Sequence, residues 1–118
     1  MKLKNFIFMS TAMIALASGA ALPAQAAGLQ QFVIERDMAG ASKLSAEQLR
    51  DASTVSNKVL RELGPDIQWV HSYVAGDKIY CVYNAPSEGL IREHAKRAGL
   101  PANKITAVSA VIDPTTAR

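Results

Sequence analysis

Four side chains in this sequence are of the types that coordinate divalent transition metals: two imidazoles, one thiol and one carboxylate. They belong to His71, Cys81, His94 and Glu35. Imidazole and thiolate are good ligands for late first-row metals such as nickel and zinc, and a carboxylate can add to them. No two of these residues are close in sequence, so a metal site depends on the fold to assemble it. The competing interpretation is that the histidines are hydrogen-bonded structural residues and that Cys81 is a small buried hydrophobe.

Other local signatures of catalysis are absent from the sequence. It has no glycine-rich phosphate loop, no G-x-S-x-G elbow, no CxxC pair and no HExxH helix. An enzyme would have to rely on acid–base groups, for which Tyr73, Tyr80, His71 and His94 are candidates. A small enzyme or ligand-binding module of this kind is the alternative to a non-catalytic metal-binding protein. A third possibility is a structural module in which His71 and Cys81 only pack.

The first 26 residues follow the pattern of a cleavable export signal. Lys2 and Lys4 provide the basic start, residues 6–17 form a largely apolar run, and Ala24-Gln25-Ala26 is a small-x-small cleavage site. We therefore predict a signal peptide over residues 1–26, export to the periplasm or the exterior, and one domain over residues 27–118. No segment of that domain is long and apolar enough to span a membrane.

Removal of the signal changes the charge of the protein. The whole chain has a formal net charge of +3, and the loss of Lys2 and Lys4 reduces it to +1. This balance predicts no basic face for nucleic acid, which requires a clustered cationic stripe. Cys81 is the only cysteine, so no disulfide can form within the chain. A domain this short then needs other support, such as a metal or a second subunit.

The mature sequence predicts the element order β-α-β-β-α-β. Ser45 and Gln48 form a capping box at the start of the first helix, and Gly64 provides a left-handed cap at its end. Ser87 and Gly99 flank the second helix in the same way. The predicted strands cover residues 32–36, 67–74, 78–84 and 105–112. This order is the ferredoxin-like α+β arrangement, a four-stranded antiparallel sheet with two helices on one face.

Both faces of the predicted hairpin carry apolar side chains, so both faces of the sheet must be covered. The two helices cover only one of them. Packing against a second copy of the chain would cover the other and would give a homodimeric α+β barrel.

The length of the hairpin turn decides where two of the candidate ligands lie. If Gly76 is the centre of a three-residue loop, His71 faces Cys81 directly across the ladder. If Gly76-Asp77 is a two-residue turn, His71 pairs with Val82 and lies on the opposite face from Cys81.

Several segments resemble a family of small ferredoxin-like proteins, formerly classed as a domain of unknown function and associated with nickel binding in a bacterial member. The segments are FVIER (32–36), IQWVHSYV (67–74), DKIYCVY (77–83), IREHA (91–95) and IDPTT (112–116). The resemblance implies a homodimeric ferredoxin-like fold that binds nickel or another divalent metal. His71, Cys81, His94 and Glu35 all lie within these segments and are the predicted metal ligands. No catalytic residue is predicted.

Overall fold

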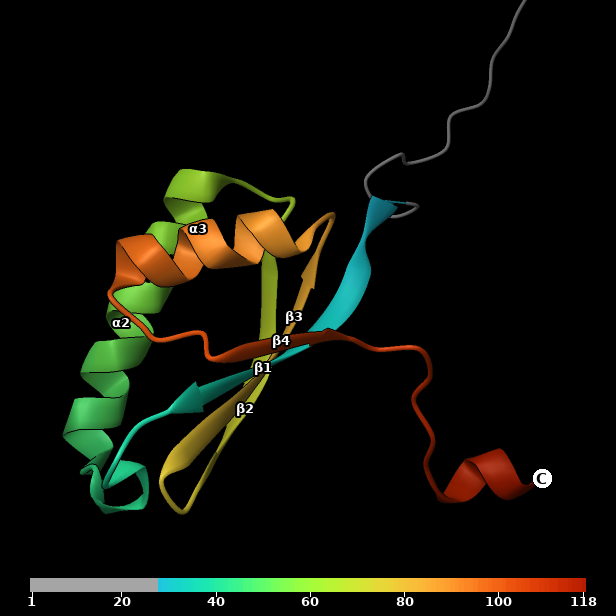
Figure 1. Cartoon of the computed structure of the whole chain (residues 1–118), viewed down its shortest axis with the longest axis horizontal. Helices are drawn as coiled ribbons and strands as arrows, with labels where there is room; N and C mark the ends of the chain where they lie inside the picture. The colour runs from blue at the N-terminus through green and yellow to red at the C-terminus, as the bar shows by residue number, and fades with distance from the viewer. Residues whose placement is uncertain (1–27) are drawn as a thin grey trace, which may run out of the picture.

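The computed structural model describes residues 28–118, so the predicted export signal lies outside the described part of the chain. Its strands and helices follow the predicted β-α-β-β-α-β order (Figure 1). The elements are β1 (Gln30–Asp37), η1 (Ala41–Lys43), α2 (Ala46–Leu63), β2 (Gln68–Ala75), β3 (Lys78–Ala85), α3 (Glu88–Ala98), β4 (Lys104–Ala107) and η2 (Pro114–Ala117). Neither of the two long helices combines the length and hydrophobicity that a membrane-crossing helix needs, within the residues described.

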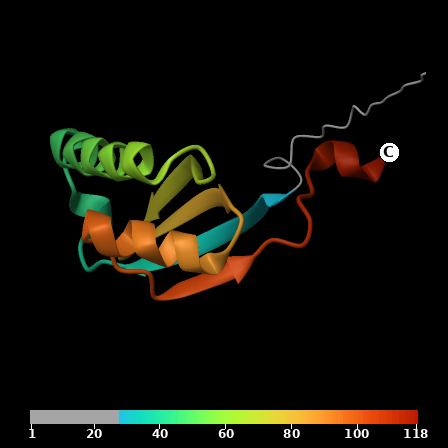
Figure 2. The same ribbon diagram turned by 90° about the horizontal axis from the view of Figure 1, so that it is seen from above.

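The four strands form one antiparallel sheet in the order β2-β3-β1-β4. Both helices lie on the same side of this sheet (Figures 1 and 2). We call the side covered by the helices the inner face and the other side the open face. Along β1, the buried residues Phe32, Ile34 and Arg36 belong to the inner face and alternate with more exposed residues of the open face. The predicted ferredoxin-like α+β fold is confirmed.

Both long helices begin at the predicted caps. Ser45 Oγ accepts a hydrogen bond from the backbone N–H of Gln48, whose side chain accepts in return from the backbone of Ser45. Ser87 caps α3 in a similar way, and Gly99 ends it in the left-handed conformation with φ +69°. Gly64 ends α2 with φ +95° and ψ −174°, a positive-φ conformation that is not the predicted left-handed one.

The hydrophobic core lies between the inner face and the two helices. Its buried members come from β1, β3, α3 and the start of the hairpin: Phe32, Ile34, Ile67, Cys81, Tyr83, Ala85 and Ile91. Leu60 and Leu63, on the last turns of α2, pack against them. The helices therefore cover much of the inner face, and the open face receives no cover from the described residues of the same chain.

The hairpin between β2 and β3 has the two-residue turn. Ala75 pairs with Lys78, which leaves Gly76 and Asp77 as the turn residues, and Gly76 adopts φ +61°. His71 consequently pairs with Val82 rather than with Cys81. Of the two registers that the sequence left open, this is the one that separates His71 from Cys81.

A β-bulge interrupts β2 at Val70. Trp69 pairs with Tyr83 and His71 pairs with Val82. These partners are adjacent on β3, whereas Trp69 and His71 have one extra residue, Val70, between them on β2. Residues two apart in a regular strand lie on the same face. The extra residue instead places Trp69 on the inner face and His71 on the open face.

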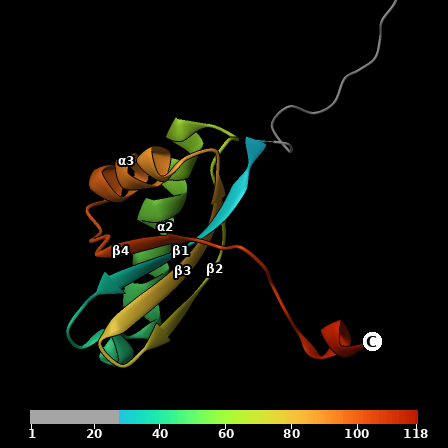
Figure 3. The ribbon, with the colours of Figure 1, turned by 45° about the vertical axis from the view of Figure 1, so that its right-hand side comes forward.

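The last strand is shorter than predicted, because the expected strand over residues 105–112 ends at Ala107. Its partner β1 begins at Gln30, and a longer β4 would run past the start of β1. Val108 makes a last backbone hydrogen bond to Gln31, after which the chain leaves the domain (Figure 3). Ile112 in this outgoing segment is 77% exposed.

Candidate functional site

The sheet separates the four predicted metal ligands into two pairs. His71 and Glu35 lie on the open face, whereas Cys81 and His94 are buried between the sheet and the helices. Within residues 28–118, no three His, Cys, Asp or Glu side chains gather closely enough to hold a metal ion. One chain therefore does not assemble the predicted four-ligand set. The reason is the two-residue turn, which fixes His71 and Cys81 on opposite faces.

The open face carries the exposed imidazole of His71 and the carboxylates of Glu35 and Asp37, which are both already paired with Lys78. The His71 ring meets the Tyr73 ring edge-on, with 4.9 Å between centroids. Glu35 accepts a hydrogen bond from Lys78 Nζ at 3.2 Å. Because β3 lies between the strands of His71 and Glu35, and their partners Val82 and Tyr80 are two residues apart on it, these two residues are about 12 Å apart. That separation is too large for one ion to bind both within one chain.

The centre of the open face is apolar and its margin is polar. Val33, Tyr73, Tyr80 and Val82 occupy the centre, where cross-strand pairs join Val33 to Val82 and Tyr73 to Tyr80. The margin includes Gln31, Asn84, Lys78, Lys104 and Thr106. An apolar centre within a polar margin is the usual composition of a protein–protein interface.

Behind the sheet, five side chains form a buried polar cluster that we call the inner cluster. It consists of Arg36, Ser56, Cys81, Tyr83 and His94. Ser56 Oγ lies 3.1 Å from His94 Nε2 and 3.4 Å from Tyr83 Oη. Arg36 Nε donates to Cys81 Sγ at 3.2 Å, and Arg36 Nη1 donates to the carbonyl of Pro101 at 2.6 Å. Arg36 Nη2 and His94 Nδ1 have no partner.

Burial disfavours the charged forms of the two titrating rings of the inner cluster. Burial raises the pKa of Tyr83, while the hydrogen bond with Ser56 and the charge of Arg36 act in the opposite direction. Burial also lowers the pKa of His94; the hydrogen bond with Ser56 opposes this, and the Arg36 charge adds to it. His94 is therefore a buried, hydrogen-bonded imidazole.

Sequence reasoning missed Arg36 and Ser56. Arg36 was placed in a strand only as a charged residue, yet it follows Phe32 and Ile34 at the period of two that marks an inward-facing position. Ser56 lies on the buried face of α2, beside Val59. The signal for both was therefore their position among apolar residues and not their residue type.

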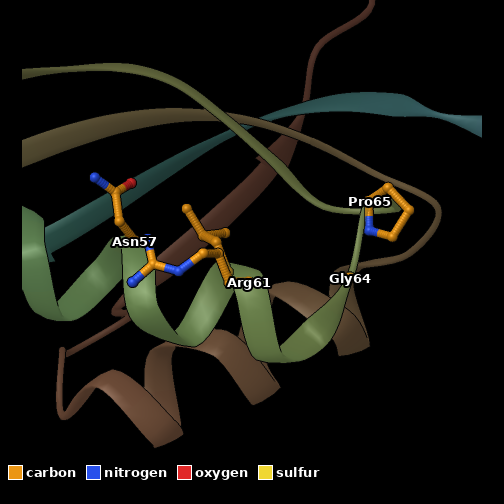
Figure 4. A pocket seen from close by; sticks show the side chains of 5 residues that line it. Asn57, Arg61, Gly64 and Pro65 are labelled. Atoms are coloured by element: carbon orange, nitrogen blue, oxygen red, sulfur yellow. The ribbon is translucent and has the colours of Figure 1, made fainter.

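The described part of the chain has two notable hollows. One, of about 190 Å³, lies between α2 and the sheet beside the inner cluster, and its wall includes Arg36, Trp69 and Ser72. The other, of about 410 Å³, lies at the end of α2 between Arg61 and Pro65 (Figure 4). None of the four acid–base candidates lines either hollow: they are Tyr73, Tyr80, His71 and His94. The alternative of an enzyme using those groups gains no support from this geometry.

The sequence over residues 32–108 matches the sequence model of the family described as nickel responsive protein SCO4226-like. The chain belongs to this family. The matched region runs from β1 to the point where the chain leaves the sheet, and it includes all four predicted metal ligands. The resemblance inferred from the sequence is therefore confirmed.

The fold of this SCO4226-like protein is also shared with a solved structure. The crystal structure of SCO4226 from Streptomyces coelicolor A3(2) aligns with a TM-score of 0.58 and 24% sequence identity. The alignment covers 70% of this chain and 99% of that chain. No curated protein matches the sequence.

We expect this SCO4226-like protein to lose stability below pH 6.5, in part because of His94. An unfolded histidine titrates near pH 6.5, and burial lowers the pKa of His94 in the fold. As the pH falls through the interval between these two pKa values, the unfolded chain takes up a proton that the folded chain excludes, which favours unfolding. Above pH 6.5 the imidazole is neutral in both states, and the effect disappears.

Thermal melts between pH 5 and pH 8 measure this effect. His94→Leu should show a smaller drop in melting temperature on acidification than the unaltered protein. His71→Gln is the matched control, because it removes an exposed histidine and should leave the drop unchanged. A drop that persists in full in His94→Leu would contradict the assignment.

Proposed function

We propose that this protein is a non-catalytic, exported homodimer that binds nickel. The match of residues 32–108 to the nickel-responsive SCO4226-like family is the observation that carries the proposal. The positions of the two histidines indicate which of them could bind nickel. His71 is exposed on the open face, whereas His94 is buried and already bonded to Ser56.

A nickel site in this protein needs side chains from more than one chain. Nickel(II) takes nitrogen and oxygen ligands, and imidazole suits it well. One chain offers no group of three ligand side chains among residues 28–118. Packing the open faces of two copies together would add a second His71 and a second Glu35 to the same interface. We therefore propose His71 as the principal ligand and Glu35 as an auxiliary one, with Cys81 and His94 left as interior residues.

The open face favours a second copy of the chain as its cover. Val33, Tyr73, Tyr80 and Val82 form an apolar centre that the described residues of the same chain leave uncovered. Stable interfaces bury about 1,200–2,000 Å² in total. A second subunit would also provide the support that a small domain without disulfides needs.

Isothermal titration of the protein with nickel tests the metal assignment. We expect saturable heat for the unaltered protein and its loss in His71→Ala. His94→Leu is the matched control, since it removes the other imidazole from the interior and should still bind nickel. A heat no different from a dilution blank in the unaltered protein would refute the proposal.

The same site predicts a pH dependence. Histidine must be neutral to bind a metal, so protons compete with nickel as the pH falls through about 6.5. The rise in melting temperature on adding nickel should therefore be present near neutral pH and fade below about pH 6. A carboxylate-only site would keep its metal down to about pH 4. A nickel effect that stays constant between pH 5 and pH 8 would exclude His71.

Export rests on the sequence pattern of residues 1–26. Mass spectrometry of protein recovered outside the cytoplasm should give Ala27, or a near neighbour, as the first residue. Recovery there of the chain with Met1 intact would contradict the cleavable signal.

A further inference from the structure

Arg36 brings a positive charge into the interior with no carboxylate to balance it. The side chain is 1% exposed on the inner face of β1. The ion pairs found within residues 28–118 involve Lys78, Arg92 and Arg97, and none of them includes Arg36. Burying a charge without a partner of opposite charge costs several kcal/mol.

The Arg36 guanidinium is fixed by hydrogen bonds but does not use all of its donors. Nε donates to Cys81 and Nη1 donates to the Pro101 carbonyl, so two of its three nitrogens fix the group in place. Nη2 carries two further N–H groups and makes no hydrogen bond of standard geometry, although the Arg36 side chain lies close enough to Tyr83 to lower the pKa of that hydroxyl. A positioned guanidinium with donors to spare matches the geometry of a carboxylate.

A cavity of about 190 Å³ lies beside this guanidinium, and Arg36 forms part of its wall. Leu49, Val74 and Ile79 are among the apolar residues that line it, and no Asp or Glu does. Ser72, also in the wall, accepts a hydrogen bond from the Trp69 indole at 2.9 Å, which leaves its own hydroxyl proton free to be donated. Few polar donors and a mostly apolar wall are typical of a site for a small organic molecule.

We propose that this cavity binds a small organic carboxylate with a short apolar chain. The carboxylate would bond to Arg36 with help from the Ser72 hydroxyl, and the chain would lie against Leu49, Val74 and Ile79. An inorganic oxyanion such as phosphate fits less well, because most of the wall surface is apolar although Ser53, Ser56 and Tyr83 also line it. The site is separate from the nickel-binding proposal, since it lies on the inner face and involves neither His71 nor Glu35.

Trp69 provides a direct readout, because it lines the cavity and is the only tryptophan in the chain. Its fluorescence should be followed while the full chain is titrated with sodium butyrate at constant ionic strength. Butyramide, the neutral isostere, and inorganic phosphate serve as comparison probes. We expect a saturable change with butyrate, and affinities at least about ten-fold weaker for both comparison probes, because only butyrate can form a charge-assisted pair while filling the apolar part.

Two substitutions and a matched control locate the binding. Arg36→Met keeps the length of the side chain and removes its charge, and it should weaken butyrate binding at least about ten-fold. It should also melt no lower than the unaltered protein, because an apolar replacement of a buried charge is often neutral or stabilising. Arg50→Met removes an exposed arginine from α2 and should bind butyrate normally. Ala52→Leu fills part of the cavity, leaves Arg36 in place and should also weaken binding.

The outcomes separate cleanly. The proposal is supported if Arg36→Met and Ala52→Leu lose the butyrate response and Arg50→Met keeps it. If Arg36→Met does not fold, the result for Ala52→Leu decides. No saturable response to butyrate, equal affinity for butyramide, tighter binding of phosphate, or full binding by Arg36→Met would each overturn the proposal.

Discussion

If the protein forms the proposed homodimer, Val33→Glu should convert that dimer into a monomer. Val33 lies at the centre of the open face, opposite Val82. In the proposed interface the new carboxylate would lose its hydration and have no counterion, which costs several kcal/mol. Since every 1.4 kcal/mol is about ten-fold in affinity, the dissociation constant of the dimer should rise by at least about a hundred-fold. Sedimentation equilibrium at micromolar concentration measures the change.

Val55→Glu is the matched control for this experiment. Val55 is also an exposed valine, at 48%, but it lies on α2 and away from the open face. That variant should remain dimeric. The Val33→Glu monomer should also lose nickel binding, because the proposed site needs ligands from two chains. An unaltered protein that sediments as a monomer, with stability independent of dilution, would remove the dimer from the proposal.

Ile34→Ala should destabilise the fold by about 2–5 kcal/mol, the range found when a large buried side chain is truncated. Ile34 is fully buried at the middle of β1, between Cys81 on one neighbouring strand and Ile105 on the other. Small domains have about 5–15 kcal/mol of stability in total, so this loss is a large part of it. Urea denaturation of the two proteins under the same conditions measures the difference.

The matched control is Ile112→Ala, because it removes the same atoms from a side chain that is 77% exposed. Its effect should lie within about 0.5 kcal/mol of zero, as for most surface substitutions. Similar losses from the two variants would mean that the core does not depend on the centre of β1.

Those parts of the fold that depend on local chemistry could be predicted from the sequence. The capping box at Ser45 and Gln48, and the cap at Ser87, act over three residues and are therefore visible in the chain itself. The end of β4 depends on where β1 begins, so strand propensity carried the prediction several residues too far past Ala107. The bulge at Val70 also depends on distant parts of the chain, because it is set by which side chains each face of the sheet must pack.

The candidate site was harder to predict because residue type does not reveal the face of a sheet. His71 and Cys81 have the right chemistry for one metal, but a single residue in the length of the turn decides whether they can meet. Arg36 carries a charge, yet its spacing of two residues from Ile34 is that of an inward-facing position, and it is buried. Position within the alternating pattern was the better guide in both cases.

The bulge in β2 also affects how relatives of this protein should be aligned. Val70 is the residue that β2 carries in excess of β3, and it is 46% exposed. A relative lacking this residue would still place the counterpart of Trp69 opposite Tyr83 and that of His71 opposite Val82. An alignment gap at residue 70 therefore keeps the residues of β2 on their own faces of the sheet. A gap placed in the neighbouring turn would assign them to the opposite faces. Length variation in this part of the family is therefore expected inside a strand, where insertions and deletions are normally excluded.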